Sequence, residues 1–352
     1  MTSRERVLLA LQHKEADRVA IQDSPWGTTI NRWRQEGLPQ NVSVSDYFGY
    51  EFTGVGADLS FRLPTKVLEE TDEYVITQGS MGSIVKNWKH STSTPELIGF
   101  TINSREKYYE HKPLLQWDRS RVNWEAGLAA QEAARKAGKF FTYSSAIGYD
   151  KHSSAFGPTT MLIGMVEDPE WIADIFMTDA RLNITAVEEM LAGGFEFDAA
   201  FLYDDMGYKN GTFFSPKCHR ELLMPAHKLL CDFFHSKGMP VILHSCGNVS
   251  GFVPLLIEAG FNCLQPLEVK AGMDLIQLKR DYGDRLAFMG GIDVRVMARG
   301  NPEEIEEEIR TKVGFAKQGG GYIYHSDHSV PDSVSFKAYC YVIDMVKKYG
   351  SY

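Results

Sequence analysis

The sequence has few cysteines, no excess of positive charge and no long hydrophobic run. Its 5 cysteines in 352 residues are an odd number at wide spacing, which favours a reducing compartment over a disulfide framework. Lys and Arg number 37 against 46 Asp and Glu, a formal net charge of -9, so we expect neither a nucleic-acid nor an anionic-membrane surface. Apolar stretches such as 239–243 are too short to cross a bilayer, and the start shows no apolar signal-peptide core. We therefore expect a cytoplasmic protein.

The chain does contain a regular alternation of short apolar runs and amphipathic stretches. Near-continuous apolar runs of this length are typical of strands buried on both faces of a parallel sheet. Asp168, Ser215 and Asn301 each precede a proline, which is a helix-start signal between the runs. Seven runs, with an eighth strand expected within 52–63, predict an α/β fold of the (β/α)8 TIM-barrel type, and an open doubly wound sheet is the alternative. The seven runs are 18–23, 139–146, 199–205, 239–244, 261–265, 285–289 and 321–325.

One segment departs from this alternation. Residues 73–89 alternate with period two around a glycine-rich turn, which predicts an antiparallel β-hairpin inserted in the N-terminal part of the barrel. We expect residues 1–352 to form a single barrel domain that carries this hairpin as an insertion.

Two histidine motifs follow the predicted strands, at the barrel mouth where functional groups collect. In His244-Ser-Cys246-Gly247, residues two apart on an extended strand point the same way, so an imidazole and a thiolate converge, and both suit Zn²⁺. Barrel closure brings His325 and His328 into the same mouth. We predict a zinc site of His244, Cys246 and His328 with one position open. His325 is an alternative third ligand or a catalytic residue, and simple hydrogen-bonded histidines are the structural alternative.

Acidic and aromatic side chains also lie at the predicted strand ends. Asp204 and Asp205 follow one strand, and strand alternation turns only one of them into the barrel, without fixing which. The inward carboxylate is a candidate general base, zinc ligand or holder of a substrate hydroxyl, and a helix cap is the alternative for either residue. The candidate substrate contacts are Asp23, Trp26, Tyr203 and Asp327.

Segments 4–19, 243–248, 288–293 and 320–331 resemble landmarks of the uroporphyrinogen decarboxylase superfamily. The resemblance covers almost the full length and implies a (β/α)8 barrel. The metal-free decarboxylases carry a Met-Arg-Gln-Ala-Gly-Arg type segment where this chain has Arg32-Trp-Arg-Gln-Glu-Gly-Leu-Pro39. The corrinoid-dependent methyltransferase branch carries His-x-Cys-Gly, matched here by His244, Cys246 and Gly247. Its third ligand is a cysteine in the coenzyme M methyltransferases, and here His328 stands in the corresponding place.

The resemblance implies a zinc-dependent methyltransferase that works with cobalamin carried by a separate corrinoid protein. Because the third ligand differs, we expect the methyl donor to be a methoxylated, aromatic compound, as for the methyltransferase I component of O-demethylases. Methyl transfer from methylcobalamin to a thiol and metal-free decarboxylation are the alternatives. The expected partners are the corrinoid protein and the small methoxylated substrate, with no nucleic acid and no membrane, and a homodimer is left open.

Overall fold

The computed structural model describes residues 1–90 and 95–352, and its centre is one sheet of eight parallel strands. The strand order is β1-β14-β13-β12-β11-β8-β7-β2, which runs consecutively around a barrel. Every predicted run contains one strand, and the eighth strand lies at the start of segment 52–63, so the (β/α)8 prediction is confirmed. The strands are β1 (Ala20–Ile21), β2 (Phe52–Val55), β7 (Phe140–Ala146), β8 (Ala199–Tyr203), β11 (Val241–His244), β12 (Cys263–Gln265), β13 (Ala287–Met289) and β14 (Tyr322–Tyr324).

The two outer strands of this sheet, β1 and β2, meet at a seam built around Glu51. The Glu51 N–H donates to the carbonyl of Ile21 over 3.0 Å, and the Glu51 carboxylate accepts the N–H of Ile21 over 2.8 Å. The same carboxylate, with 1% of its side chain exposed, pairs with Arg18 at 2.8 Å and with Arg6. A buried carboxylate with three donors therefore supplies part of the hydrogen bonding that a strand ladder provides elsewhere in the sheet.

The inward-facing side chains change from apolar to polar along five of the barrel strands, whereas β8 and β13 keep apolar Phe201 and Met289 at the upper position. Helix α1 (Ser3–Leu11) packs its apolar face under the barrel and, with the lower inward residues, forms a dry floor. Two residues further along most strands, the inward positions line a cavity at the C-terminal end of the barrel. The floor includes Ala20, Phe140, Ala199, Ile242, Cys263, Ala287 and Ile323, and the layer above includes Gln22, Thr142, Phe201, His244, Gln265, Met289 and His325.

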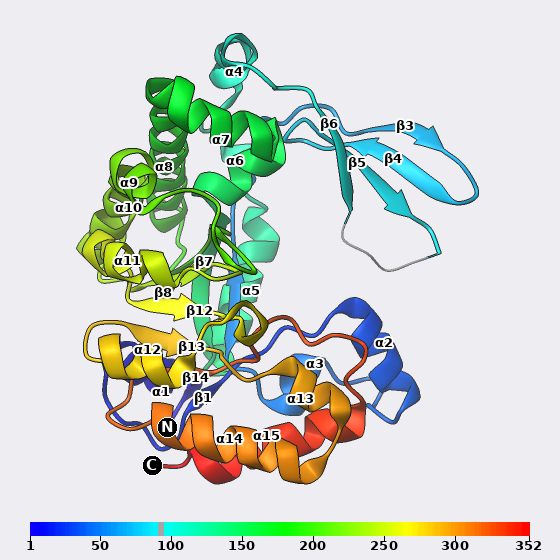
Figure 1. Cartoon of the computed structure of the whole chain (residues 1–352), viewed down its shortest axis with the longest axis vertical. Coiled ribbons are helices and arrows are strands. Elements are labelled where there is room, and N and C mark those ends of the chain that lie inside the picture. The colour runs from blue at the N-terminus through cyan, green and yellow to red at the C-terminus, as the bar shows by residue number, and fades with distance from the viewer. Residues whose placement is uncertain (91–94) are drawn as a thin grey trace.

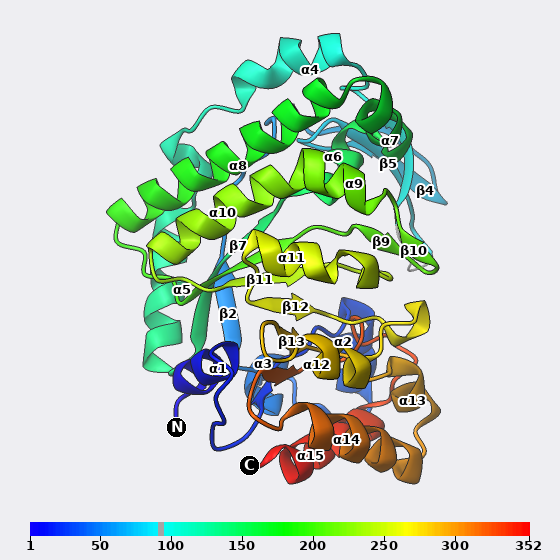
Figure 2. The ribbon, with the colours of Figure 1, turned by 60° about the vertical axis from the view of Figure 1, so that its left-hand side comes forward.

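Helices surround the barrel, and both termini lie at the end of the molecule near α1 and α15 (Figure 1). Long helices α8 and α10 run side by side across β7, β8 and β11 (Figure 2). In the described ranges, no helix combines the length and apolarity needed to cross a membrane. The remaining helices are α2 (Gly27–Gln35), α3 (Val44–Phe48), α4 (Arg105–His111), α5 (Trp124–Lys136), α6 (Gly148–Phe156), α7 (Pro158–Glu167), α8 (Pro169–Ala192), α9 (Pro216–Cys218), α10 (Met224–Ser236), α11 (Val253–Ala259), α12 (Leu275–Tyr282), α13 (Val294–Arg299), α14 (Pro302–Ala316) and α15 (Phe336–Gly350).

A four-stranded antiparallel sheet, in the order β3-β4-β5-β6, is inserted between β2 and α4. The predicted hairpin corresponds to its two central strands, β4 (Tyr74–Gln78) and β5 (Ser83–Trp88). Strands β3 (Lys66–Glu70) and β6 (Glu96–Phe100) extend the hairpin on its two sides, which the sequence pattern did not reveal. The sheet projects from the body as an arm (Figure 1).

Two buried histidines lie behind the barrel wall. His219 belongs to a π-helical turn that leads into α10, and neither of its ring nitrogens has a hydrogen-bond partner in the described structure. Its ring lies 4.8 Å from that of Phe252. The Nε2 atom of His227 lies 2.9 Å from the Asp204 carboxylate. Burial lowers the pKa of both imidazoles to about 3, so both are neutral near pH 7.

Glu51→Ala is expected to destabilise the fold strongly. The substitution removes one of the two carboxylates that pair with the buried Arg6, which keeps Asp17, and it leaves the Ile21 N–H without its side-chain acceptor. The lost charge-assisted hydrogen bond and the unpaired N–H together cost about 3–5 kcal/mol in the free energy of unfolding. Urea unfolding followed by circular dichroism measures this loss. The matched control is Glu258→Ala, which removes an exposed pair with Arg220 and should cost about 0–1 kcal/mol. Equal stability of the two variants would contradict the role assigned to the seam.

His219→Phe is expected to flatten the dependence of stability on pH. Native His219 stays neutral down to about pH 3, whereas in the unfolded chain it takes up a proton near pH 6.5, so its contribution destabilises the fold as the pH falls below 6.5. Between pH 6 and pH 5, the free energy of unfolding should fall less in the variant than in the wild type. The difference should be up to about 1.4 kcal/mol per pH unit. The exposed His90, changed to glutamine, is the control and should keep the wild-type slope. An unchanged slope in His219→Phe would show that this imidazole is protonated in the native state.

Candidate functional site

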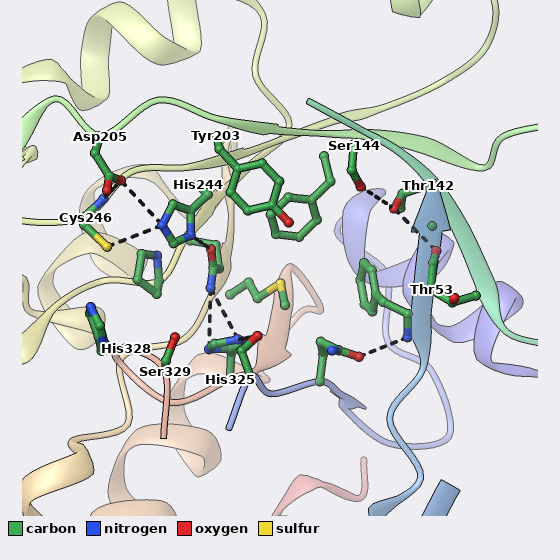
Figure 3. A pocket seen from close by; sticks show the side chains of 18 residues that line it. Thr53, Thr142, Ser144, Tyr203, Asp205, His244, Cys246, His325, His328 and Ser329 are labelled. Carbon is green, nitrogen blue, oxygen red and sulfur yellow. Dashed lines mark hydrogen bonds and ion pairs between the residues drawn. The ribbon is translucent and has the colours of Figure 1, made fainter. Parts of the chain in front are cut away.

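A cavity of about 430 Å³ occupies the barrel mouth (Figure 3). Metal-ligating side chains lie on one side of it, at the ends of β8 and β11 and after β14. Hydroxyl side chains lie on the opposite side, on β7. Because parallel strands all end at the same face of a barrel, residues far apart in sequence meet here.

The structure brings His244 and Cys246 together at the end of β11, as their spacing predicts. Cys246 Sγ lies 3.3 Å from His244 Nε2. Gly247 follows with a φ of 79°, and a Cβ there would lie 2.2 Å from the carbonyl carbon of Gly207. The turn that presents the thiol to the cavity therefore requires glycine at position 247.

Gln265, at the end of the neighbouring strand β12, sets the orientation of the His244 ring. The Nδ1 atom of His244 donates to Oε1 of Gln265, which leaves the Nε2 lone pair directed at Cys246 and at Asp205 Oδ1, 3.4 Å away. Burial lowers the pKa of His244 and so favours the neutral imidazole, the form that binds a metal.

The structure separates the roles of the two adjacent aspartates. Asp205 lies on the same side of the chain as Tyr203, lines the cavity and accepts the N–H of Cys246 over 2.7 Å. Asp204 points away, is fully buried, and accepts the N–H of Asp150 over 2.9 Å in the first turn of α6. Burial raises the pKa of Asp204 well above its usual range. Asp204 is a helix cap outside the cavity, and only Asp205 is available to a ligand.

Two overlapping groups of three potential metal ligands share Cys246. Asp205, His244 and Cys246 form one group, and Cys246, Glu268 and His328 form the other, with the ligand atoms in each group within 4.8 Å of one another. In the described structure, His244, Cys246 and His328 do not form such a group by themselves. Sulfur, imidazole nitrogen and carboxylate oxygen are the donors that zinc prefers, so the residues present fit this ion.

Glu268 is a candidate metal ligand that the sequence reasoning missed, and that reasoning likewise assigned no role to the cavity-lining residues Gln265, Thr142 and Ser144. Glu268 is buried, three residues beyond the end of β12, and its Oε1 lies 3.8 Å from Nε2 of His328. Its position just after the predicted strand 261–265 could have identified it, because the other candidate ligands also follow predicted strands. Burial and nearby acids, Asp205 and Glu268, raise the pKa of the Cys246 thiol, so a cation at this point would be needed to favour its thiolate.

His325 lines the cavity but belongs to neither ligand group. Its Nδ1 donates to the carbonyl of Ser326 over 2.7 Å, which leaves Nε2 as an acceptor, 3.4 Å from Oγ of Ser24. Asp23 lies behind this ring, 2% exposed, and accepts hydrogen bonds from the hydroxyls of Tyr324 and Tyr339. Asp23 therefore braces the wall behind His325 and does not face the cavity.

The remaining predicted substrate contacts lie in different surroundings. Tyr203 lines the cavity, with its ring centroid 5.2 Å from that of His244. Trp26 lies outside the cavity at the start of α2, 42% exposed, with its ring centroid 6.3 Å from that of His328. Asp327 is fully buried and accepts the N–H groups of Val269 and Val294, so it supports the loops that follow two strands.

Comparisons with known proteins agree with this arrangement. The chain is 24% identical over 136 residues to a methylated-thiol–coenzyme M methyltransferase from Methanosarcina mazei, a match covering 38% of this chain and 34% of that protein. The matched segment thus spans about a third of the relative's length. A solved methyltransferase structure from Methanosarcina mazei has the same fold, with a TM-score of 0.69, 16% identity and 99% of each chain covered. The sequence model of the uroporphyrinogen decarboxylase (URO-D) family matches residues 153–349. With more than half of its length matched, the chain belongs to the uroporphyrinogen decarboxylase family, and within it the chain is similar to methyltransferases.

Proposed function

We propose that the protein is a zinc-dependent methyltransferase that moves a methyl group from a methoxylated, aromatic substrate to the Co(I) of a separate corrinoid protein. The observation that carries the proposal is the His244–Cys246 pair at the barrel mouth, with its imidazole fixed by Gln265. Membership of the family and similarity to methyltransferases support the class of reaction.

The proposed zinc ligands are His244, Cys246 and His328, and Glu268 beside His328 is a further oxygen donor. A zinc ion held there would act as a Lewis acid on the ether oxygen and stabilise the phenolate that develops as the methyl group leaves. The chain's own contribution is to aim the donor atoms: Gln265 fixes the ring of His244, and Gly247 turns the backbone so that the thiol faces the same point.

Other residues of the mouth would position the substrate. Phe52, Phe201 and Tyr203 form an aromatic side of the cavity, with 5.1 Å between the ring centroids of Phe201 and Tyr203, and this side would pack against a flat ring. Asp205 would hold a hydroxyl next to the ether oxygen. His325 faces the cavity with Nε2 as an acceptor, 3.4 Å from both Ser24 Oγ and Gln265 Nε2, and a substrate hydroxyl would compete with these donors for that atom.

The cavity residues suit one of the two alternative reactions, methyl transfer to a thiol, better than the other, decarboxylation of a porphyrinogen. Methyl transfer to a thiol is favoured by the relative whose name includes a methylated thiol, and the same donor atoms would serve it. Decarboxylation of a porphyrinogen requires partners for several carboxylates, and within the described residues no lysine or arginine lines the cavity. The geometry therefore favours methyl transfer over decarboxylation.

The purified chain is expected to hold one zinc ion. His244→Ala and Cys246→Ser should each lower the zinc content to well below one equivalent, because each removes a ligand of a site with few donors. Elemental analysis after dialysis measures the metal. Cys218→Ser, at a cysteine on α9 away from the cavity, is the matched control and should retain a full equivalent. Full zinc in both site variants would refute the site.

Demethylation is expected to require a corrinoid protein in its Co(I) state. With a methoxylated aromatic substrate and that partner, the absorbance of methyl-cobalt should appear. Cys246→Ser should lower the rate of methyl-cobalt formation by roughly a hundredfold or more, because the proposed zinc ion, a dominant electrostatic stabiliser, would be lost. The chain alone should show no turnover. Robust demethylation in the absence of cobalamin would rule out this mechanism.

A further inference from the structure

We propose that Ser144, supported by Thr142, binds a hydroxyl group at the end of the substrate opposite the metal ligands. The substrate would then be an uncharged aromatic methyl ether that carries, besides its ether group, a hydroxyl able to donate a hydrogen bond. This inference rests on the proposed function and narrows its substrate.

The two side chains form a polar wall on β7, called here the hydroxyl wall. Thr142 and Ser144 are two residues apart, both line the cavity, and Figure 3 shows them across the cavity from His244 and Cys246. Gly54 on the neighbouring strand makes room for them, because a Cβ at position 54 would lie 2.4 Å from both the hydroxyl and the carbonyl oxygen of Thr142.

The direction of the hydrogen bonds gives the wall a definite polarity. The Thr142 hydroxyl lies 3.4 Å from the carbonyl oxygen of Thr53, which can only accept, so Thr142 donates its proton there. Ser144 lies 3.3 Å from Thr142, and where Thr142 donates to Thr53 the proton of this second pair comes from Ser144. The Ser144 oxygen therefore presents lone pairs to the cavity, and the group it recognises is a donor such as a phenolic hydroxyl.

The charges around the cavity point to the same ligand. No lysine or arginine lines it in the part of the chain that the structure describes, and Asp205 contributes a carboxylate. A carboxylate on the substrate would meet an acceptor at Ser144 and no cationic side chain along the wall, so its desolvation would go uncompensated. Phe201 and Tyr203 belong to β8, which lies between β7 and β11 in the sheet, so a flat ring packed against them would reach from the hydroxyl wall to the candidate metal ligands.

The test combines one change in the protein with one change in the ligand. Binding of 4-methoxyphenol and of 4-methylanisole, which has a methyl group in place of the hydroxyl, is measured by calorimetry on the zinc-loaded full chain. Ser144→Ala should weaken binding of 4-methoxyphenol by about five- to tenfold and leave binding of 4-methylanisole unchanged, since a hydrogen bond is lost only with the first. Wild-type protein should bind 4-methoxyphenol more tightly than 4-methoxybenzoate.

Ser145→Ala is the matched control. Ser145 is the next residue on the same strand, lies outside the cavity lining and donates to the carbonyl of Ala146, so its loss should change neither affinity. Equal effects of Ser144→Ala on both probes, tighter binding of 4-methoxybenzoate, or no binding of 4-methoxyphenol to the wild type would overturn the inference. The assay contains no corrinoid protein, so a failure of the predicted binding can be distinguished from a failure of the proposed methyl transfer.

Discussion

The hydrogen bond from His244 Nδ1 to Gln265 Oε1 is the interaction on which the site depends. It joins two neighbouring parallel strands at paired positions, β11 ending at His244 and β12 ending at Gln265. With Nδ1 engaged, the ring cannot turn, and Nε2 faces Cys246 and Asp205. The tautomer and the direction of the imidazole are thereby set by the sheet register, which is the pre-organisation that the proposed zinc site would require.

The barrel keeps its apolar floor separate from the cavity-lining layer above it, so the polar site does not interrupt the packing that stabilises the fold. The inward residues near α1 are small or apolar and pack without polar atoms, so the floor excludes water. Two residues further along the strands, the inward residues face the cavity, and most of them carry polar groups. Buried carboxylates outside the cavity have full sets of donors: Asp23 accepts from tyrosine hydroxyls and Asp327 from backbone N–H groups. These acids hold the mouth in shape, leaving Asp205 as the cavity-facing carboxylate of the Asp204–Asp205 pair.

The sequence predicts the strands and the His244–Cys246 pair well because both follow from local regularities, burial on two faces and a period of two. It could not assign Asp204 and Asp205, because a shift of one residue at the strand end reverses which side chain faces inward. The sequence could not show that Asp23 and Asp327 are buried outside the cavity lining, because donors to their carboxylates come from segments distant in sequence. Glu268 was missed because it follows its strand by three residues, in a loop whose path only the folded chain defines.

The most direct test of the metal centre is X-ray absorption at the zinc edge of the loaded protein. The proposed ligands predict one sulfur neighbour at about 2.3 Å, from Cys246, with the other neighbours nitrogen or oxygen at about 2.0–2.2 Å. A spectrum without sulfur, or with two or more sulfur neighbours, would contradict the assignment of zinc to His244, Cys246 and His328.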